Sequence, residues 1–259
     1  MSRACRRLVS PPDVGPTMSF ALYDDLAGLR FWRQSELHLR RRIRDAVLDT
    51  VRDTLADINQ MWAFEEVETP PMMPLARMSA AYDRADVFVL QDPPGGDRPY
   101  ALRAETTDGS YAIAARILRT TRLRPPLCVW QMGYSYRRET RDGATAAKLR
   151  LNAFTQLELQ LIHAEDTKAD IAGPLRDALV PVIQRMSGLE TRLIASDRLP
   201  PYATETIDIE CLQPDGEWRE VASTSRRTDF PAVPGFKPCK VVELAFGMDR
   251  LVALANGGL

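Results

Sequence analysis

Arginines, glutamates and an aromatic residue recur together in three stretches of the chain. These stretches are Gln131-Met-Gly-Tyr-Ser-Tyr-Arg137-Arg-Glu139, Arg150-Leu-Asn-Ala-Phe154-Thr-Gln-Leu-Glu158 and Glu243-Leu-Ala-Phe-Gly-Met-Asp-Arg250-Leu-Val. A guanidinium is planar, permanently charged and able to make two parallel hydrogen bonds to a phosphate, so Arg137 and Arg250 suit the oxygens of a polyphosphate. Phe154 could stack on a flat ring. The alternatives are surface salt bridges for the arginines and a place in the hydrophobic core for Phe154.

Thiol and zinc chemistry find little support in the sequence. Four cysteines, Cys5, Cys128, Cys211 and Cys239, are widely spaced without a CxxC pair, and there are two histidines, His38 and His163. This spacing argues against a structural zinc site. Together with the lack of a secretory signal pattern, it favours a reducing cytoplasm, where the thiols serve as packing residues.

The composition is that of an ordinary globular protein. Of 259 residues, 45% are hydrophobic and 27% charged, and the formal net charge is -1. A near-neutral chain is no general polyanion binder, so any nucleic-acid contact must come from local basic patches. No apolar run approaches the roughly 18 residues needed to cross a bilayer, and we therefore expect no membrane association. Residues 1–17 are expected to be a disordered tail, followed by one domain over residues 18–259.

Hydrophobic periodicity predicts the elements that must position these residues. A helical pattern runs over residues 24–62, with apolar residues at three- and four-residue steps. Its basic run Arg40, Arg41, Arg42 and Arg44 could contact nucleic acid or form a solvated face. Strands are expected at 64–70, 87–90, 100–103, 128–136, 151–162, 206–212, 218–223 and 240–245, and a helical insert at 164–194. Turn signals between them favour antiparallel pairing, hence an α/β (α+β) fold with an antiparallel sheet of about six or seven strands flanked by helices.

In this order and spacing, the first helix and strand up to Pro70 and the three stretches above resemble the three signature motifs of class II aminoacyl-tRNA synthetases. Three further segments are similar to the glycine-specific branch. They are Leu102-Arg-Ala-Glu-Thr-Thr-Asp-Gly109, with Ala104 in place of the branch's proline, Tyr202-Ala-Thr-Glu-Thr-Ile-Asp-Ile-Glu210 and Arg227-Thr-Asp-Phe230. The resemblance covers residues 24 to 254. It implies a class II synthetase-like domain that forms a homodimer through residues 24–70.

The resemblance also implies a reaction, the activation of a small amino acid, glycine favoured, by ATP. Arg137 and Glu139 would hold ATP, Phe154 would stack on adenine and Arg250 would lie against the γ-phosphate. The attacking group is a substrate carboxylate that is already ionised at neutral pH, so no protein base is needed. Positioning and charge neutralisation can then supply the catalysis.

For the amino acid, the resemblance implies a small acidic pocket. Glu105 and Glu243 would hold the ammonium group, and Arg227 would assist the carboxylate or brace an acidic neighbour. The glycine family has a serine where this chain has Ala245. Losing that hydroxyl removes a contact worth on the order of 1 kcal/mol, which leaves the choice among small amino acids open. Mg²⁺ is expected to accompany ATP, with Glu210 and Glu243 as candidate ligands and a structural role as the alternative for Glu210.

The acceptor and the overall organisation stay open. A tRNA acceptor end could contact Arg138, Arg141, Lys148 and Arg150 through its phosphates. A carrier protein, a peptide or a small molecule are alternative acceptors. Glycine enzymes continue past the third motif into an anticodon-binding domain of roughly 100 residues, a typical domain size. This sequence ends nine residues after Arg250, so it represents either part of a longer enzyme or a stand-alone core.

A second reading is a non-catalytic synthetase paralogue that serves as a regulatory or accessory subunit. Such paralogues keep the fold and lose the ATP-binding arginines. The joint presence of Arg137, Glu139, Phe154 and Arg250 argues against this alternative.

Overall fold

The computed structural model describes residues 22–24, 28–58, 61–78, 82, 84–90, 99–139, 150–197 and 199–255. The expected tail, residues 1–17, lies outside these ranges, as do Cys5, Arg141 and Lys148. Within the described ranges, no helix combines the length and apolarity that crossing a membrane requires.

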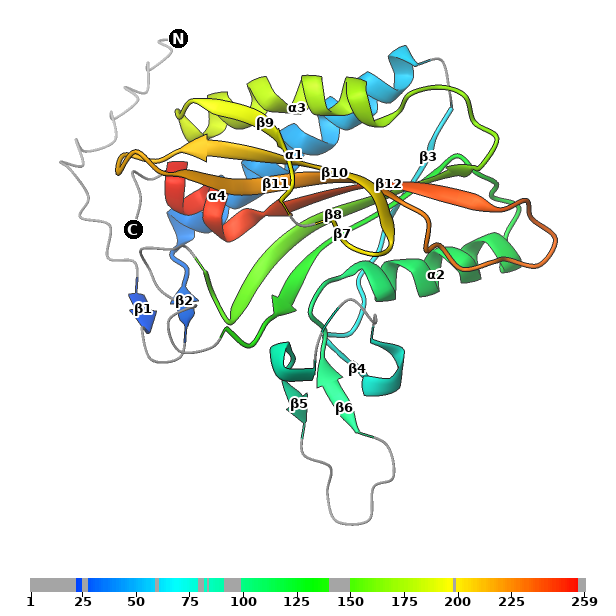
Figure 1. Ribbon diagram of the computed structural model, residues 1–259, viewed down its shortest axis with the longest axis horizontal. Coiled ribbons are helices and arrows are strands. Elements are labelled where there is room, and N and C mark those ends of the chain that lie inside the picture. Colours follow the sequence, from blue (N-terminus) through cyan, green and yellow to red (C-terminus); the bar gives the residue numbers. More distant parts are fainter. Residues whose placement is uncertain are drawn as a thin grey trace, which may run out of the picture.

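A seven-stranded sheet forms the centre of the fold, in the order β3-β7-β8-β12-β11-β10-β9 (Figure 1). Its strands are β3 (Ala63–Glu66), β7 (Leu127–Tyr136), β8 (Ala153–Ala164), β9 (Thr191–Ala195), β10 (Ala203–Leu212), β11 (Trp218–Arg227) and β12 (Cys239–Gly247). Five neighbouring pairs are antiparallel, and β3 pairs with β7 in parallel. The expected antiparallel sheet is confirmed, with one parallel pair at its edge.

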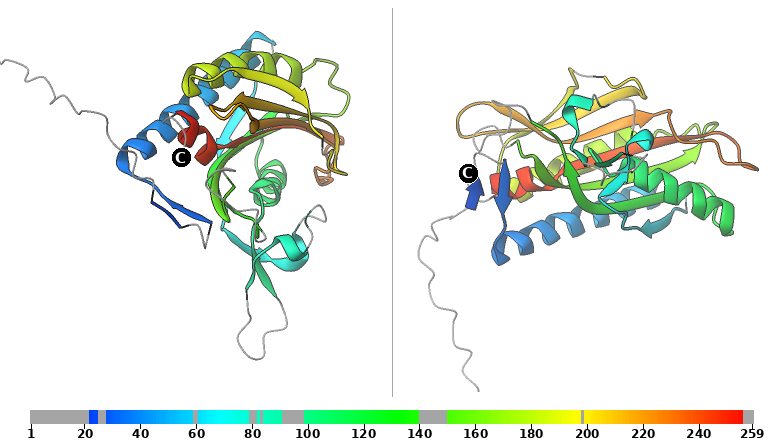
Figure 2. Two further views of the ribbon diagram at one scale, coloured as in Figure 1. Left: turned by 60° about the vertical axis from the view of Figure 1, so that its left-hand side comes forward. Right: turned by 90° about the horizontal axis from the view of Figure 1, so that it is seen from below.

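Alternation along the strands separates a covered face of the sheet from an open one. On β12, Val242, Leu244 and Phe246 are buried in the main core, whereas Glu243 and Ala245 point to the opposite face. The main core lies between the sheet and three helices, α1 (Gln34–Asp57), α3 (Ala172–Ser187) and α4 (Met248–Ala255). Figure 2 shows these helices on one side of the curved sheet. The open face is therefore free to carry polar side chains.

A helix and a small lobe lie beyond the open face. Helix α2 (Thr107–Thr120) buries Tyr111, Ala114 and Leu118 in a second core against Leu127 and Val129 of β7. The small lobe is a three-stranded sheet with two short 3-10 helices (Figures 1 and 2). Its elements are β4 (Met72–Pro74), η1 (Leu75–Arg77), η2 (Arg84–Asp86), β5 (Val89–Leu90) and β6 (Tyr100–Leu102). The strands expected at 87–90 and 100–103 thus belong to the small lobe and not to the main sheet.

The two expected helices are shorter than their sequence patterns. Strands β1 (Leu22–Asp24) and β2 (Leu29–Phe31) pair antiparallel, and Gly28, directly before β2, has a positive φ of 59°, so α1 begins only at Gln34. The helix expected at 164–194 is wrong at both ends. Strand β8 continues to Ala164, and α3 ends where Gly188 adopts a left-handed φ of 71°, which lets β9 join the sheet.

The three cysteines within the described residues have positions consistent with a packing role. Cys128 and Cys211 are buried in the main core, and Cys239 is half-buried. Burial raises the pKa of the Cys128 thiol, so this group stays protonated and unreactive.

Candidate active site

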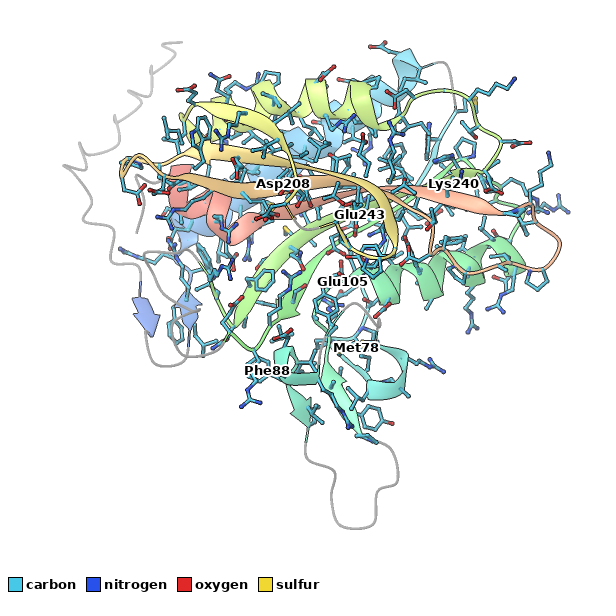
Figure 3. The ribbon with its side chains drawn as sticks, in the orientation of Figure 1. Met78, Phe88, Glu105, Asp208, Lys240 and Glu243 are labelled. Carbon is cyan, nitrogen blue, oxygen red and sulfur yellow. The ribbon has the colours of Figure 1, made fainter. Side chains whose placement is uncertain are left out.

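A cavity of about 590 Å³ lies over the open face of the sheet. Alternate residues of β8, β12, β11 and β10 form its floor, and Glu105 and Tyr82 close it towards the small lobe. In Figure 3, Asp208, Glu243 and Glu105 follow one another from the sheet towards this lobe. Most of the candidate residues line it: Glu105, Arg137, Arg138, Glu139, Arg150, Phe154, Glu243, Ala245 and Arg250.

Three buried glutamates, Glu105, Glu158 and Glu243, form an acidic cluster at one end of the cavity. Glu105 comes from the turn before α2, and the other two come from the neighbouring strands β8 and β12. Glu243 Oε1 accepts hydrogen bonds from Thr107 Oγ1 and from Gln160 Nε2, both at 3.0 Å. Glu158 Oε2 accepts a hydrogen bond from the hydroxyl of Thr106, and the Thr107 hydroxyl, whose one proton it shares with Glu243, lies 3.2 Å away. The carboxylates are therefore held in fixed positions.

Arg227 braces the acidic cluster from behind. Its side chain is 1% exposed, and its Nη1 lies 2.8 Å from Glu243 Oε2 and 3.7 Å from Glu105 Oε1. Its Nη2 lies 2.7 Å from Asp229 Oδ2, and its guanidinium carbon lies 3.8 Å from the ring centre of Tyr202. Of the two roles considered for Arg227, this geometry matches the bracing of acidic neighbours.

The acidic cluster holds more negative charge than Arg227 can balance. Burial raises the pKa of Glu158 to about 8, and Glu243 and Glu105 add to this rise. Burial also raises the pKa of Glu105, with Arg227 opposing and Glu243 adding to the effect. Within the described residues, Glu105 Oε1 has no hydrogen-bond partner. A cation with several N–H donors would satisfy this cluster, and an ammonium group is such a cation.

Arginines converge at the other end of the cavity. Arg137 follows β7, and its guanidinium carbon lies 5.2 Å from the ring centre of Phe154 on β8. Arg250, on α4, donates a hydrogen bond to the backbone oxygen of Glu220. Burial lowers the pKa of Arg250, and despite the opposing Glu220 the nearby charges of Arg150, Arg137 and Arg219 lower it further. Clustered cations of this kind favour an anionic ligand.

Two acidic residues at this basic end contact β8 and the segment directly before it. Glu139 follows β7, and Asp249 lies on α4. Glu139 Oε2 lies 3.6 Å from Arg150 Nη1. Asp249, next to Arg250, accepts a hydrogen bond from the backbone N–H of Thr155 at 2.9 Å. Arg40 of α1 lies 3.7 Å from Asp249 Oδ1 and donates to Thr155 Oγ1 at 2.8 Å. Arg40 therefore points into the protein, unlike the solvated or nucleic-acid-binding arginine considered from the sequence.

Of the two acidic residues expected to bind a phosphate-bound cation, Glu243 lines the cavity and Glu210 does not. The carboxylate of Glu210 pairs with Arg192 at 2.7 Å. Asp208 of β10 and Glu220 of β11 line the cavity instead. Burial raises the pKa of Asp208 to about 6, with Glu220 as the next cause. Among the described residues, no three His, Cys, Asp or Glu side chains could hold a metal by themselves. Two carboxylates suffice for Mg²⁺ that also binds phosphates.

Sequence reasoning missed several residues of the site. Glu158 is the clearest case, because the period of two along β8 places it on the same face as Phe154. The same period of two could have identified Asp208 on β10 and Glu220 on β11. Tyr82 lies in an irregular segment, where no periodicity could have identified it. Arg138 and Arg150 lie at the cavity, but Arg141 and Lys148 fall outside the described residues.

Comparisons with solved structures define the class of fold. A prolyl-tRNA synthetase from Cryptosporidium parvum, complexed with halofuginone and AMPPNP, aligns with a TM-score of 0.70 at 14% identity over 92% of this chain and 50% of that one. The Giardia lamblia prolyl-tRNA synthetase in complex with prolyl-adenylate aligns with a TM-score of 0.64 at 15% identity, over 88% and 48%. The fold is thus the class II synthetase core. The chain belongs to the family of the tRNA synthetase class II core domain (G, H, P, S and T), whose model matches residues 88–255.

Curated relatives are glycine–tRNA ligases. The chain is 32% identical over 133 residues to that of Clostridium tetani, which is 50% of this chain and 28% of the relative. It is 29% identical over 116 residues to that of Methanocaldococcus jannaschii, which is 44% and 19%. The chain therefore spans less than a third of the length of these relatives.

Proposed function

We propose that this protein activates a small amino acid, glycine first, with ATP to form an aminoacyl-adenylate. One observation carries the proposal: a single cavity has a buried acidic cluster at one end and convergent arginines at the other. An amino acid and ATP present the complementary charges, an ammonium group and a triphosphate. Similarity to glycine–tRNA ligases over half of the chain supports the choice of glycine.

The amino acid binds with its ammonium group in the acidic cluster. Glu105 Oε1, which lacks a hydrogen-bond partner among the described residues, accepts one N–H, and Glu158 and Glu243 supply the remaining negative charge. Arg227 keeps Glu243 and Glu105 in place. Ala245 lines the floor directly opposite Glu158 in the sheet register, where a methyl group leaves room for a small substrate side chain.

ATP binds at the basic end. Phe154 stacks on the adenine ring, Glu139 accepts from its amino group, and Arg137 and Arg250 bind phosphates. A substrate carboxylate oxygen attacks the α-phosphorus, the bond from that phosphorus to the bridging oxygen breaks, and pyrophosphate leaves. Since the nucleophile is ionised at neutral pH, the protein contributes alignment and charge neutralisation. Asp208 and Glu220, which line the cavity, would hold Mg²⁺ together with phosphate oxygens, and the ion would supply charge neutralisation for the leaving pyrophosphate.

The activated amino acid then passes to an acceptor, either a tRNA acceptor end or another nucleophile. Arg138 and Arg150 at the cavity are suited to acceptor phosphates. Assembly as a homodimer through α1 and β3 is part of the same proposal. Met61, beside β3, is 96% exposed and provides apolar surface for that contact.

ATP–pyrophosphate exchange tests the proposal directly. Wild-type protein should exchange with glycine, and Arg137→Ala and Arg250→Ala should each lower the rate by two or more decades, because a lost phosphate contact costs a few kcal/mol. Arg119→Ala is the matched control, since Arg119 is exposed in the last turn of α2, bonds the backbone oxygen of Ala115 and does not line the cavity. If no amino acid supports pyrophosphate exchange by the wild type, the accessory-subunit alternative is favoured. Unchanged rates in both variants would refute the site assignment.

A further inference from the structure

A second cavity, of about 320 Å³, lies in the small lobe next to the acidic cluster. Its lining is mostly apolar and includes Leu75, Ala76, Met78, Val87 and Pro99. Figure 3 shows Glu105 between Glu243, on the sheet, and Met78, in the small lobe. The expected amino-acid site and this apolar cavity are therefore neighbours.

Tyr82 is the residue that the two cavities share among the described residues that line them. Its hydroxyl donates a hydrogen bond to Glu105 Oε2 at 2.6 Å and accepts one from Arg137 Nη2 at 3.2 Å. The Arg137 guanidinium carbon also lies 5.5 Å from the centre of the Tyr82 ring. Contacts to both ends of the main cavity fix the ring in place as a wall.

We infer that Tyr82 sets the size limit of the amino-acid pocket, because its ring closes the acidic cluster off from the apolar cavity. A shorter residue at this position joins the two spaces and admits an amino acid with an unbranched apolar side chain. This inference rests on the proposed function and adds to it the residue that determines specificity. The chemistry of the substrate side chain follows from the lining, which offers Met, Leu, Val and Pro surfaces beside one charged residue, Arg84.

The hydroxyl of Tyr82 has a separate effect from its ring. By donating to Glu105 Oε2, it leaves Glu105 Oε1 to the ammonium group. This hydrogen bond also opposes the rise in the pKa of Glu105 that burial causes. Removing only the hydroxyl should weaken ammonium binding without changing which side chains fit. Removing the ring should change which side chains fit.

Three variants separate these effects in pyrophosphate exchange with glycine and methionine. Tyr82→Phe should raise the KM for glycine about tenfold with little change in kcat, and methionine should remain excluded. Tyr82→Ala should raise the ratio of kcat/KM for methionine to that for glycine by at least about a hundredfold, since each accommodated methylene is worth roughly tenfold or more. Adding Ala76→Phe to Tyr82→Ala refills the apolar cavity and should reverse most of this gain.

Selectivity in Tyr82→Ala equal to that of the wild type would overturn the inference. If Tyr82→Ala does not fold by circular dichroism, Tyr82→Val carries the same comparison. Should the wild type show no exchange at all, calorimetry with glycyl and methionyl sulfamoyl-adenosine still tests whether Tyr82 limits the size of the pocket. Binding of the glycyl compound alone by the wild type, and of both compounds by Tyr82→Ala, supports this role of Tyr82. Binding of neither compound by the wild type refutes the proposed function, and the inference fails with it.

Discussion

Replacing Glu158 by glutamine should remove the pH dependence of stability that this residue imposes on the protein. Glu158 has its pKa raised from 4.5 to about 8 by burial and by Glu243 and Glu105. Between these values the folded chain keeps a proton that the unfolded chain releases, so this group stabilises the fold fully below pH 4.5 and loses that contribution as pH rises through about 8. At about 1.4 kcal/mol for each unit of pKa difference, the loss is on the order of 5 kcal/mol, shared with the neighbouring carboxylates.

Glutamine is nearly isosteric, and its amide oxygen can accept the hydrogen bond of the Thr106 hydroxyl as the carboxylate does. Urea unfolding from pH 5 to 8.5 should therefore show the wild type losing a few kcal/mol relative to Glu158→Gln. Glu217→Gln, at an exposed turn, is the control and should follow the wild type. Parallel curves for wild type and Glu158→Gln would refute the argument that Glu158 holds this proton.

Glycine binding provides a second readout of the same group. An ammonium beside Glu158 favours its ionised form, so the wild type should release a proton on binding glycine at pH 7. Calorimetry in two buffers of different ionisation enthalpy measures this release. Glu158→Gln should bind glycine more weakly and release less.

The remaining predictions concern selectivity, metal and stability. Ala245→Ser should raise the preference for glycine over alanine in exchange by about tenfold, because the hydroxyl occupies space that the alanine methyl would use; an unchanged ratio would contradict this. Asp208→Asn should raise the Mg²⁺ concentration needed for half-maximal exchange, whereas Glu210→Gln should not, and the reverse order would restore Glu210 as the ligand. Gly133→Ala should lower the free energy of unfolding by about 1–3 kcal/mol, since the added methyl would lie 2.4 Å from Arg103 Nη2, and this buried guanidinium is held by hydrogen bonds from Nε to Tyr134 O and from Nη1 to Thr69 O; a melting curve identical to wild type would refute it.

Periodicity predicted the parts of the fold that are buried on one side. The stripe of α1 and the alternation of apolar residues on β8 and β12 are such cases, because packing against the main core imposes the period of the element. Boundaries were missed where a glycine conformation decided them, as at Gly28 and Gly188. A φ above zero is a property of one residue and its surroundings, and no periodic signal accompanies it.

For the site, sequence reasoning reached the residues whose side chains were expected to bind ligand directly. It missed Tyr82, whose place at the cavity depends on tertiary contacts with Glu105 and Arg137. Glu210 illustrates the limit, because its strand was identified correctly while its carboxylate is taken by Arg192 from β9, a strand that the sequence pattern assigned to a helix. An error in one element thus changed the expected partner of a residue in another.

The contact of Arg40 with Asp249 and Thr155 makes α1 a support of the proposed nucleotide site, although no described residue of α1 lines the cavity. Asp249 adjoins Arg250 in the chain, and Thr155 adjoins Phe154, so one guanidinium from α1 would steady both proposed contacts, that of Arg250 with phosphate and that of Phe154 with adenine. Displacement of α1 along its axis would move both together. A protein engineer who alters this helix to change how subunits associate should therefore find that nucleotide affinity changes in the same variants, at a distance from every substituted residue.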